Sequence, residues 1–149
     1  MDFSLAEEQQ AFRETARQFA AEQLAPQAAD WDENCVFPVE TLRAAAALGF
    51  GGIYVRDDVG GSGLGRLDAA LIFEELSAGC TSTAAYLSIH YMAAWMIDVR
   101  GSEEQRARWL PGLTSMDLLA SYCLTEPGAG SDAAALKARA ERDVDHYVL

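Results

Sequence analysis

The chain has 149 residues, of which 50% are hydrophobic and 23% charged, enough for one domain with a buried core. Its 23 acidic and 11 basic residues give a formal net charge of -12. This balance argues against a nucleic-acid binder, because contacts with phosphates need a basic surface. The widely spaced Cys35, Cys80 and Cys123 indicate neither a disulfide framework nor a zinc site, which favours a reducing compartment.

The first half of the chain has the pattern of amphipathic helices. Ser4 and Glu7 have the spacing of a capping box, and apolar residues then recur at helical spacing until Leu24. We expect Pro26 to kink or end this helix. Pro38 suits the first turn of a second helix, which Gly49 can close in a left-handed conformation.

Three more helices are predicted before the pattern changes. Residues 50–55 read as a short extended segment, and a glycine-rich loop leads from there into a helix over 67–78. A helix over 82–99 follows. Its nearly apolar run, Ala84 to Val99, is interrupted by His90 and falls short of the about 20 residues needed to span a membrane. Ser102 and Gln105 form a second capping box, which starts a helix expected to end before Pro111.

From Leu118 the chain reads as extended structure. An apolar stretch with no helical stripe is followed by a loop, and residues 136–149 alternate around a polar turn at Asp143 to Asp145. The sequence therefore predicts a mainly α chain, with a helical domain over 1–117 and the incomplete beginning of a β-domain over 118–149. Because the last predicted strand has an unpaired edge, we expect the chain to be truncated.

Several motifs fail as catalytic or metal sites. Gly60 and Gly65 have the spacing of a phosphate-binding loop, but Arg66 and Leu67 occupy the positions that need Lys and Ser or Thr. His90 and His146 have no Cys or carboxylate at ligand spacing, so both are interpreted as structural. Ser131 follows Gly130 directly and is not a nucleophile elbow. We predict no metal site and no catalytic residue in this chain.

The stretch "YCLTEPGAGSD", Tyr122 to Asp132, carries the strongest functional signal. A predicted strand ends at Thr125 and Glu126, and Gly128 and Gly130 then permit a ligand to approach the backbone closely. Such a loop suits a planar, hydrogen-bonding cofactor or an anionic group. From the residues alone, an ordinary turn remains the alternative.

This stretch resembles the signature of the acyl-CoA dehydrogenase family, and "VGGSGLGRLDAALIFEEL" and "GSEEQRARWLPGL" resemble that family's N-terminal helical domain in the same order. The resemblance implies a flavoenzyme whose FAD takes hydride from an acyl-CoA thioester, giving the 2-enoyl-CoA, and is reoxidised by an electron-transfer flavoprotein. The implied substrate is a short branched acyl-CoA, with isobutyryl-CoA of valine catabolism first and 2-methylbutyryl-CoA or butyryl-CoA as alternatives. A homotetramer is implied for the full-length enzyme.

The resemblance also implies site residues. The strand Tyr122, Cys123, Leu124 and Thr125 would run along the flavin, with Gly130 and Ser131 in the adjoining loop. Ser131 would also contact the CoA part of the substrate. The same resemblance places Ala84, Leu87 and Ser88 at the acyl pocket, with a purely structural role in the core as the alternative.

The catalytic base of the family is a glutamate of the C-terminal domain, which this chain lacks, and Glu126 is not assigned that role. The N-terminus "MDFSLAEEQQ" has neither the basic start of a signal peptide nor the arginines of a transit peptide. We therefore expect the cytoplasm for a bacterial chain and the mitochondrial matrix for a processed eukaryotic one. The alternative from another class is a noncatalytic helical interaction module of the same fold that has lost its flavin.

Overall fold

The computed structural model describes residues 4–149, and most of them are helical or lie in short connections between helices. The α-helices are α1 (Glu7–Phe19), α2 (Ala28–Glu33), α3 (Val39–Ala47), α4 (Arg66–Gly79), α5 (Thr81–Arg100) and α6 (Glu103–Thr114). A π-helical turn, η1 (Ala20–Leu24), continues α1, and two 3-10 turns are η2 (Asp57–Val59) and η3 (Ala133–Ala135). The predicted mainly α fold class is confirmed.

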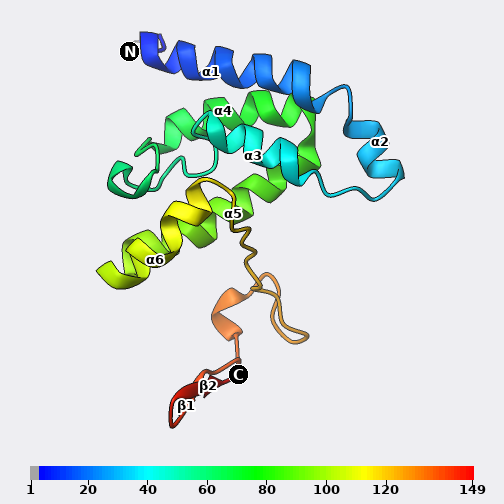
Figure 1. Cartoon of the computed structure of the whole chain (residues 1–149). Helices are drawn as coiled ribbons and strands as arrows, with labels where there is room; N and C mark the ends of the chain where they lie inside the picture. The colour runs from blue at the N-terminus through cyan, green and yellow to red at the C-terminus, as the bar shows by residue number, and fades with distance from the viewer. Residues whose placement is uncertain (1–3) are drawn as a thin grey trace.

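Helix α4 lies between α1 and α5 (Figure 1), and the hydrophobic core is formed by buried residues of these three helices and of α3. Phe19, Ile72 and Leu76 are buried there together with Leu87 and Tyr91 of α5. A second cluster, formed by Val55, Ala94, Leu110 and Leu113, joins α6 to the other side of α5. The long helix α5 is therefore the element against which both halves of the bundle pack.

Two ion-pair systems join neighbouring helices, one partly exposed between α1 and α4 and one centred on a buried pair between α5 and α6. Glu75 of α4 bonds Arg13 and Arg17 of α1, with the Arg13 Nε to Glu75 Oε1 distance at 2.7 Å. Asp98 of α5 accepts a hydrogen bond from Arg106 Nε of α6 at 2.8 Å and another from the Arg56 backbone N–H at 3.2 Å. Burial opposes the ionisation of Asp98, but the hydrogen bonds from Arg106 and Arg56 outweigh it and hold the pKa of Asp98 below its ordinary value.

The helix ends differ in part from the sequence predictions. The N-cap of α1 is Ala6, whose N–H donates to the Gln9 side chain at 3.1 Å, so the predicted Ser4 and Glu7 capping box is wrong. The predicted capping box at Ser102 and Gln105 is confirmed. Gly49 closes the helix before it with φ of +86°, as expected.

Two further predictions on the helices are wrong. Helix α6 continues through Pro111 to Thr114, because the buried Leu110 and Leu113 on either side of the proline hold this last turn in the core. Residues 50–55 form consecutive turns and no strand. Phe50, Ile53 and Val55 are buried in these turns, so the apolar run reflects burial and not sheet pairing. Helix α2 was not predicted.

The C-terminal part extends away from the helices (Figure 1). Strands β1 (Glu141–Asp143) and β2 (His146–Val148) pair antiparallel, with Arg142 opposite Tyr147, which confirms the predicted hairpin. Residues 121–125 are not assigned as a strand, since no other strand of the described residues lies beside them. None of the helices in residues 4–149 combines the length and apolar character needed to cross a bilayer.

Candidate functional site

The connection from α6 to the loop is fixed by hydrogen bonds to the helical domain. The chain turns at Met116, which has φ of +59° and a fully buried side chain. The Leu118 N–H then donates to the Gly112 carbonyl at 2.8 Å. Two residues later the Ala120 N–H donates to Nδ1 of His90 at 3.2 Å. The chain therefore leaves the helical domain at a defined place and direction.

Residues 121–125 form an extended segment whose polar backbone is unpaired. The structure shows no hydrogen bond between the backbone groups of these residues and any other described residue. The side chains alternate, with Tyr122 and Leu124 partly buried and Cys123 and Thr125 exposed. An extended backbone with free N–H and C=O groups can bind a planar ligand along its edge, as a neighbouring strand would.

A tight turn follows the extended segment. The Glu126 N–H donates to the Ala129 carbonyl at 3.0 Å, and the Ala129 N–H returns a bond to the Glu126 carbonyl at 3.1 Å. Gly128 and Gly130 have open space where a side chain would begin. A ligand can therefore approach the backbone of this turn without meeting side-chain atoms.

Glu126 stabilises the loop from within. Its carboxylate accepts hydrogen bonds from the Lys137 N–H at 2.9 Å and the Ala138 N–H at 2.8 Å, which ties the two ends of the 126–138 loop together. These backbone donors, Lys137 first, lower the pKa of Glu126. A carboxylate that is held ionised by two amides is poorly suited to accept a substrate proton, which agrees with leaving Glu126 out of catalysis.

The predicted flavin residues are adjacent in the structure and suit the cofactor. Thr125 and Ser131 are exposed, and neither hydroxyl bonds another described residue. Free hydroxyls, unpaired backbone amides and open glycines together match the polar edge of an isoalloxazine ring, which presents both donors and acceptors. The residues present therefore fit FAD, and the individual assignments stay predictions.

The three residues assigned to the acyl pocket have different surroundings. Ala84 and Leu87 are buried in the core and contact protein on all sides. Ser88 lies on another face of α5, where it lines a cavity of about 310 Å³ with Arg66, Met92 and Trp95 among its other walls. The guanidinium of Arg66 stacks over the Tyr54 ring at 4.3 Å. Of the three, Ser88 has the geometry of a pocket residue, and the assignment of all three stays a prediction.

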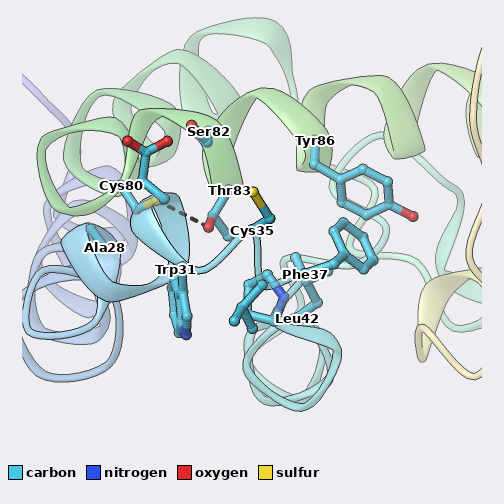
Figure 2. Close-up of a pocket in the computed structure, with 12 residues that line it drawn as sticks. Ala28, Trp31, Cys35, Phe37, Leu42, Cys80, Ser82, Thr83 and Tyr86 are labelled. Carbon is cyan, nitrogen blue, oxygen red and sulfur yellow. Dashed lines mark hydrogen bonds between the residues drawn. The ribbon is translucent and has the colours of Figure 1, made fainter.

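A second cavity, of about 250 Å³, lies between α2, the start of α3 and the start of α5 (Figure 2). Trp31, Phe37 and Tyr86 form aromatic walls, and the rings of Phe37 and Tyr86 meet edge to face at 4.7 Å between centroids. The Thr83 hydroxyl bonds Cys80 Sγ at 3.1 Å on its polar side. Sequence reasoning missed this cavity because it missed α2, although Ala28 and Trp31 have the spacing of one helical face.

The helical order and the loop define a class of protein. Residues 6–117 match the N-terminal domain of acyl-CoA dehydrogenases, and the chain belongs to this family. Among its relatives, it is 59% identical over 145 residues to the mitochondrial isobutyryl-CoA dehydrogenase of Bos taurus, an alignment that covers 97% of this chain and 35% of the relative. The corresponding protein of Dictyostelium discoideum is 55% identical, with the same coverage of 97% and 35%.

Solved structures agree with this assignment. A glutaryl-coenzyme A dehydrogenase in complex with glutaryl-CoA has a TM-score of 0.91 and 32% identity, covering 99% of this chain and 38% of that chain. Butyryl-CoA dehydrogenase from Megasphaera elsdenii has a TM-score of 0.86 and 32% identity, covering 97% of this chain and 39% of that chain. The sequence resemblance to the family is confirmed. The chain spans about a third of the length of its curated relatives, 35% in both cases.

Proposed function

We propose that this chain is the N-terminal part of an FAD-dependent dehydrogenase that oxidises isobutyryl-CoA to its 2-enoyl-CoA in valine breakdown. The observation that carries the proposal is the unpaired extended segment 121–125, with its open glycine turn, in a chain 59% identical to an isobutyryl-CoA dehydrogenase. The family membership and the loop chemistry support FAD as the cofactor. The acyl group rests on the names of the two relatives.

The residues of this chain would bind and orient. Backbone groups of Tyr122 to Thr125 would hydrogen-bond the polar edge of the flavin, and Ser131 would bind the CoA part of the substrate. When bound, FAD supplies the hydride acceptor of the reaction. Ser88 would face the acyl group, and the catalytic base would come from outside this chain. Burying the thioester beside fixed donors would stabilise the charge that develops on its oxygen.

The partners and the location belong to the same proposal. The electron acceptor is an electron-transfer flavoprotein, and the full-length enzyme is a homotetramer. The location is the bacterial cytoplasm or, for a eukaryotic chain, the mitochondrial matrix; the mitochondrial relatives support the second. The -12 net charge of this chain means that cations for the CoA phosphates come mainly from elsewhere.

The visible spectrum of the full-length protein tests the activity. A flavin band that bleaches on anaerobic addition of isobutyryl-CoA would support the proposal. Faster bleaching by butyryl-CoA or 2-methylbutyryl-CoA would support the dehydrogenase activity but assign it a different preferred substrate. A colourless protein would contradict the proposal and favour the noncatalytic interaction module.

Two single substitutions test the loop residues. We expect Thr125→Ala to weaken flavin binding and Ser131→Ala to weaken acyl-CoA binding, each about fivefold, since one hydrogen bond contributes about 1 kcal/mol. Both hydroxyls are exposed and unpaired, so thermal unfolding should not change. Thr15→Ala on the exposed face of α1 is the matched control and should alter neither affinity. Unchanged flavin and acyl-CoA affinities in both loop variants would contradict the site.

A further inference from the structure

His90 links α5 to two segments that are far from it in sequence. The ring is fully buried; Nε2 lies 2.9 Å from the Leu113 carbonyl oxygen of α6, and Nδ1 lies 3.2 Å from the backbone nitrogen of Ala120. The second contact is the last hydrogen bond between the helical domain and the chain before the unpaired segment 121–125. The position of that segment therefore depends in part on this side chain of α5, in addition to the Leu118 bond and the buried Met116.

The two partners determine the protonation of the ring. The Ala120 N–H is a donor, so Nδ1 must carry a lone pair, and the Leu113 carbonyl is an acceptor, so Nε2 must carry the hydrogen. Only the neutral ring with hydrogen on Nε2 satisfies both. A second proton would place an N–H at Nδ1 against the Ala120 N–H, and that bond would be lost.

The surroundings of His90 favour the neutral ring. Its titratable neighbour on α5 is Tyr86, with 6.2 Å between ring centroids, while α6 presents the Leu113 carbonyl and the connection presents the Ala120 amide. In residues 4–149, no charged side chain bonds the ring. Burial is the main cause that lowers the pKa of His90 below its ordinary value.

We infer that His90 is a positioning residue that holds the segment Tyr122–Thr125 in place for the flavin, and that it does so only as a neutral ring. The inference rests on the proposed function, since it assigns His90 to the flavin site of that function. Without the Ala120 bond, the segment can move relative to α5, and the flavin would bind a less ordered edge.

Two variants of the full-length protein separate the bond from the packing. His90→Phe keeps a ring in the core but removes both nitrogens, and we expect flavin binding about tenfold weaker at pH 7. His90→Asn keeps an acceptor for the Ala120 N–H and does not titrate in this range, so we expect affinity within about threefold of wild type. His146→Asn, in the exposed hairpin, is the matched control and should leave flavin affinity unchanged.

The pH profile is the readout that a purely structural histidine would not affect. Because burial lowers the pKa of the folded His90 ring, its contribution to flavin affinity should persist at pH 6.5 and fall only when the pH reaches that lowered pKa. We expect this fall in wild type and in His146→Asn, and we expect it to be absent in His90→Asn. Amide hydrogen exchange, corrected for intrinsic rates, should show faster exchange at residues 118–125 in His90→Phe. If His90→Phe does not fold, the pH profiles of flavin affinity in His90→Asn and in wild type still test the role of His90.

The outcomes distinguish the two proposals. A yellow wild type whose His90 variants keep its flavin affinity and its pH profile would overturn the role of His90 and leave the proposed function standing. A colourless wild type would overturn the proposed function, and the flavin role of His90 with it.

Discussion

At the residue scale, glycine determines how closely the 50–55 turns pack against the end of α6. A Cβ placed on Gly51 would lie 2.1 Å from the Thr114 carbonyl oxygen, and one on Gly52 would lie 2.6 Å from the Thr114 side chain. Backbone atoms cannot yield at such distances without moving the helix end. This close approach sets where α6 ends and therefore where the chain begins its course toward the candidate flavin segment.

Gly51→Ala should consequently destabilise the protein. We expect a loss of more than about 2 kcal/mol in the free energy of unfolding, because the new methyl group meets backbone and not a flexible side chain. Chemical denaturation checks this value. Gly128→Ala is the control, with open space where the methyl group would be, and should change stability by less than about 0.5 kcal/mol. Equal effects of the two substitutions would show that α6 can shift at low cost.

At the element scale, most helices could be predicted because their apolar spacing persists over several turns, whereas some of their ends could not. The Gln9 side chain accepts a hydrogen bond from the N–H of Ala6, which is the N-cap although it is neither Ser nor Thr. The Ser4 and Glu7 spacing therefore predicted the wrong start for this helix. Pro111 suggested a stop that the packing of its buried neighbours overrides. Tertiary contacts decided these positions, and a local pattern does not contain them.

In the candidate site, too, some residues could be predicted from the sequence and others depend on tertiary contacts. The loop motif is contiguous in sequence, so Thr125, Gly130 and Ser131 could be found from the residues. His90 could not be assigned a role, because its partners are backbone groups 23 and 30 residues away. The burial of Ala84 and Leu87 likewise depends on which face of α5 meets the core, and a helix that is apolar on most sides does not reveal that face.

The ion pairs of Glu75 join α1 to α4, and Glu75→Gln should weaken that packing. Hydrogen bonds from Arg17 and Arg13 lower the pKa of Glu75 to about 2. We expect a loss of about 1–2 kcal/mol at pH 7, a value reduced by the partial exposure of both arginines. Urea unfolding of this variant and of Glu74→Gln, an exposed neighbour, gives the comparison. A loss no larger than that of Glu74→Gln would mean that apolar contacts alone hold the two helices together.

At the scale of the whole molecule, the helical bundle is a fixed support for a chemically open C-terminal segment. Titratable groups of α4 and α5 lie in or beside the core, while the hydroxyls of Thr125 and Ser131 are exposed and unpaired. A buried group whose pKa differs between the folded and the unfolded chain makes the free energy of unfolding of the helical bundle depend on pH. Variation at the exposed loop should instead alter binding and leave stability unchanged.

The pH dependence of stability should therefore have a plateau with a distinct decline on each side. Below pH 6.5 the unfolded chain protonates His90 while the folded chain does not, since burial lowers the pKa of His90. The free energy of unfolding then falls as the pH falls, by at most about 1.4 kcal/mol per pH unit for one group. Below pH 4.5 Glu75 adds to the decline, and below pH 3.8 Asp98 does so, because both pKa values are lowered in the folded state.

On the alkaline side the sign reverses. Burial raises the pKa of Tyr91 well above 10.0, so above that pH the unfolded chain loses a proton that the folded chain retains, and stability falls as the pH rises. Denaturation of wild type and His90→Asn between about pH 3 and pH 11 measures the declines on both sides. The variant should lose the decline that begins near pH 6.5 and keep the one above pH 10. If the decline near pH 6.5 persisted in the variant, it would belong to another group, and His90 would not be the group that titrates on unfolding.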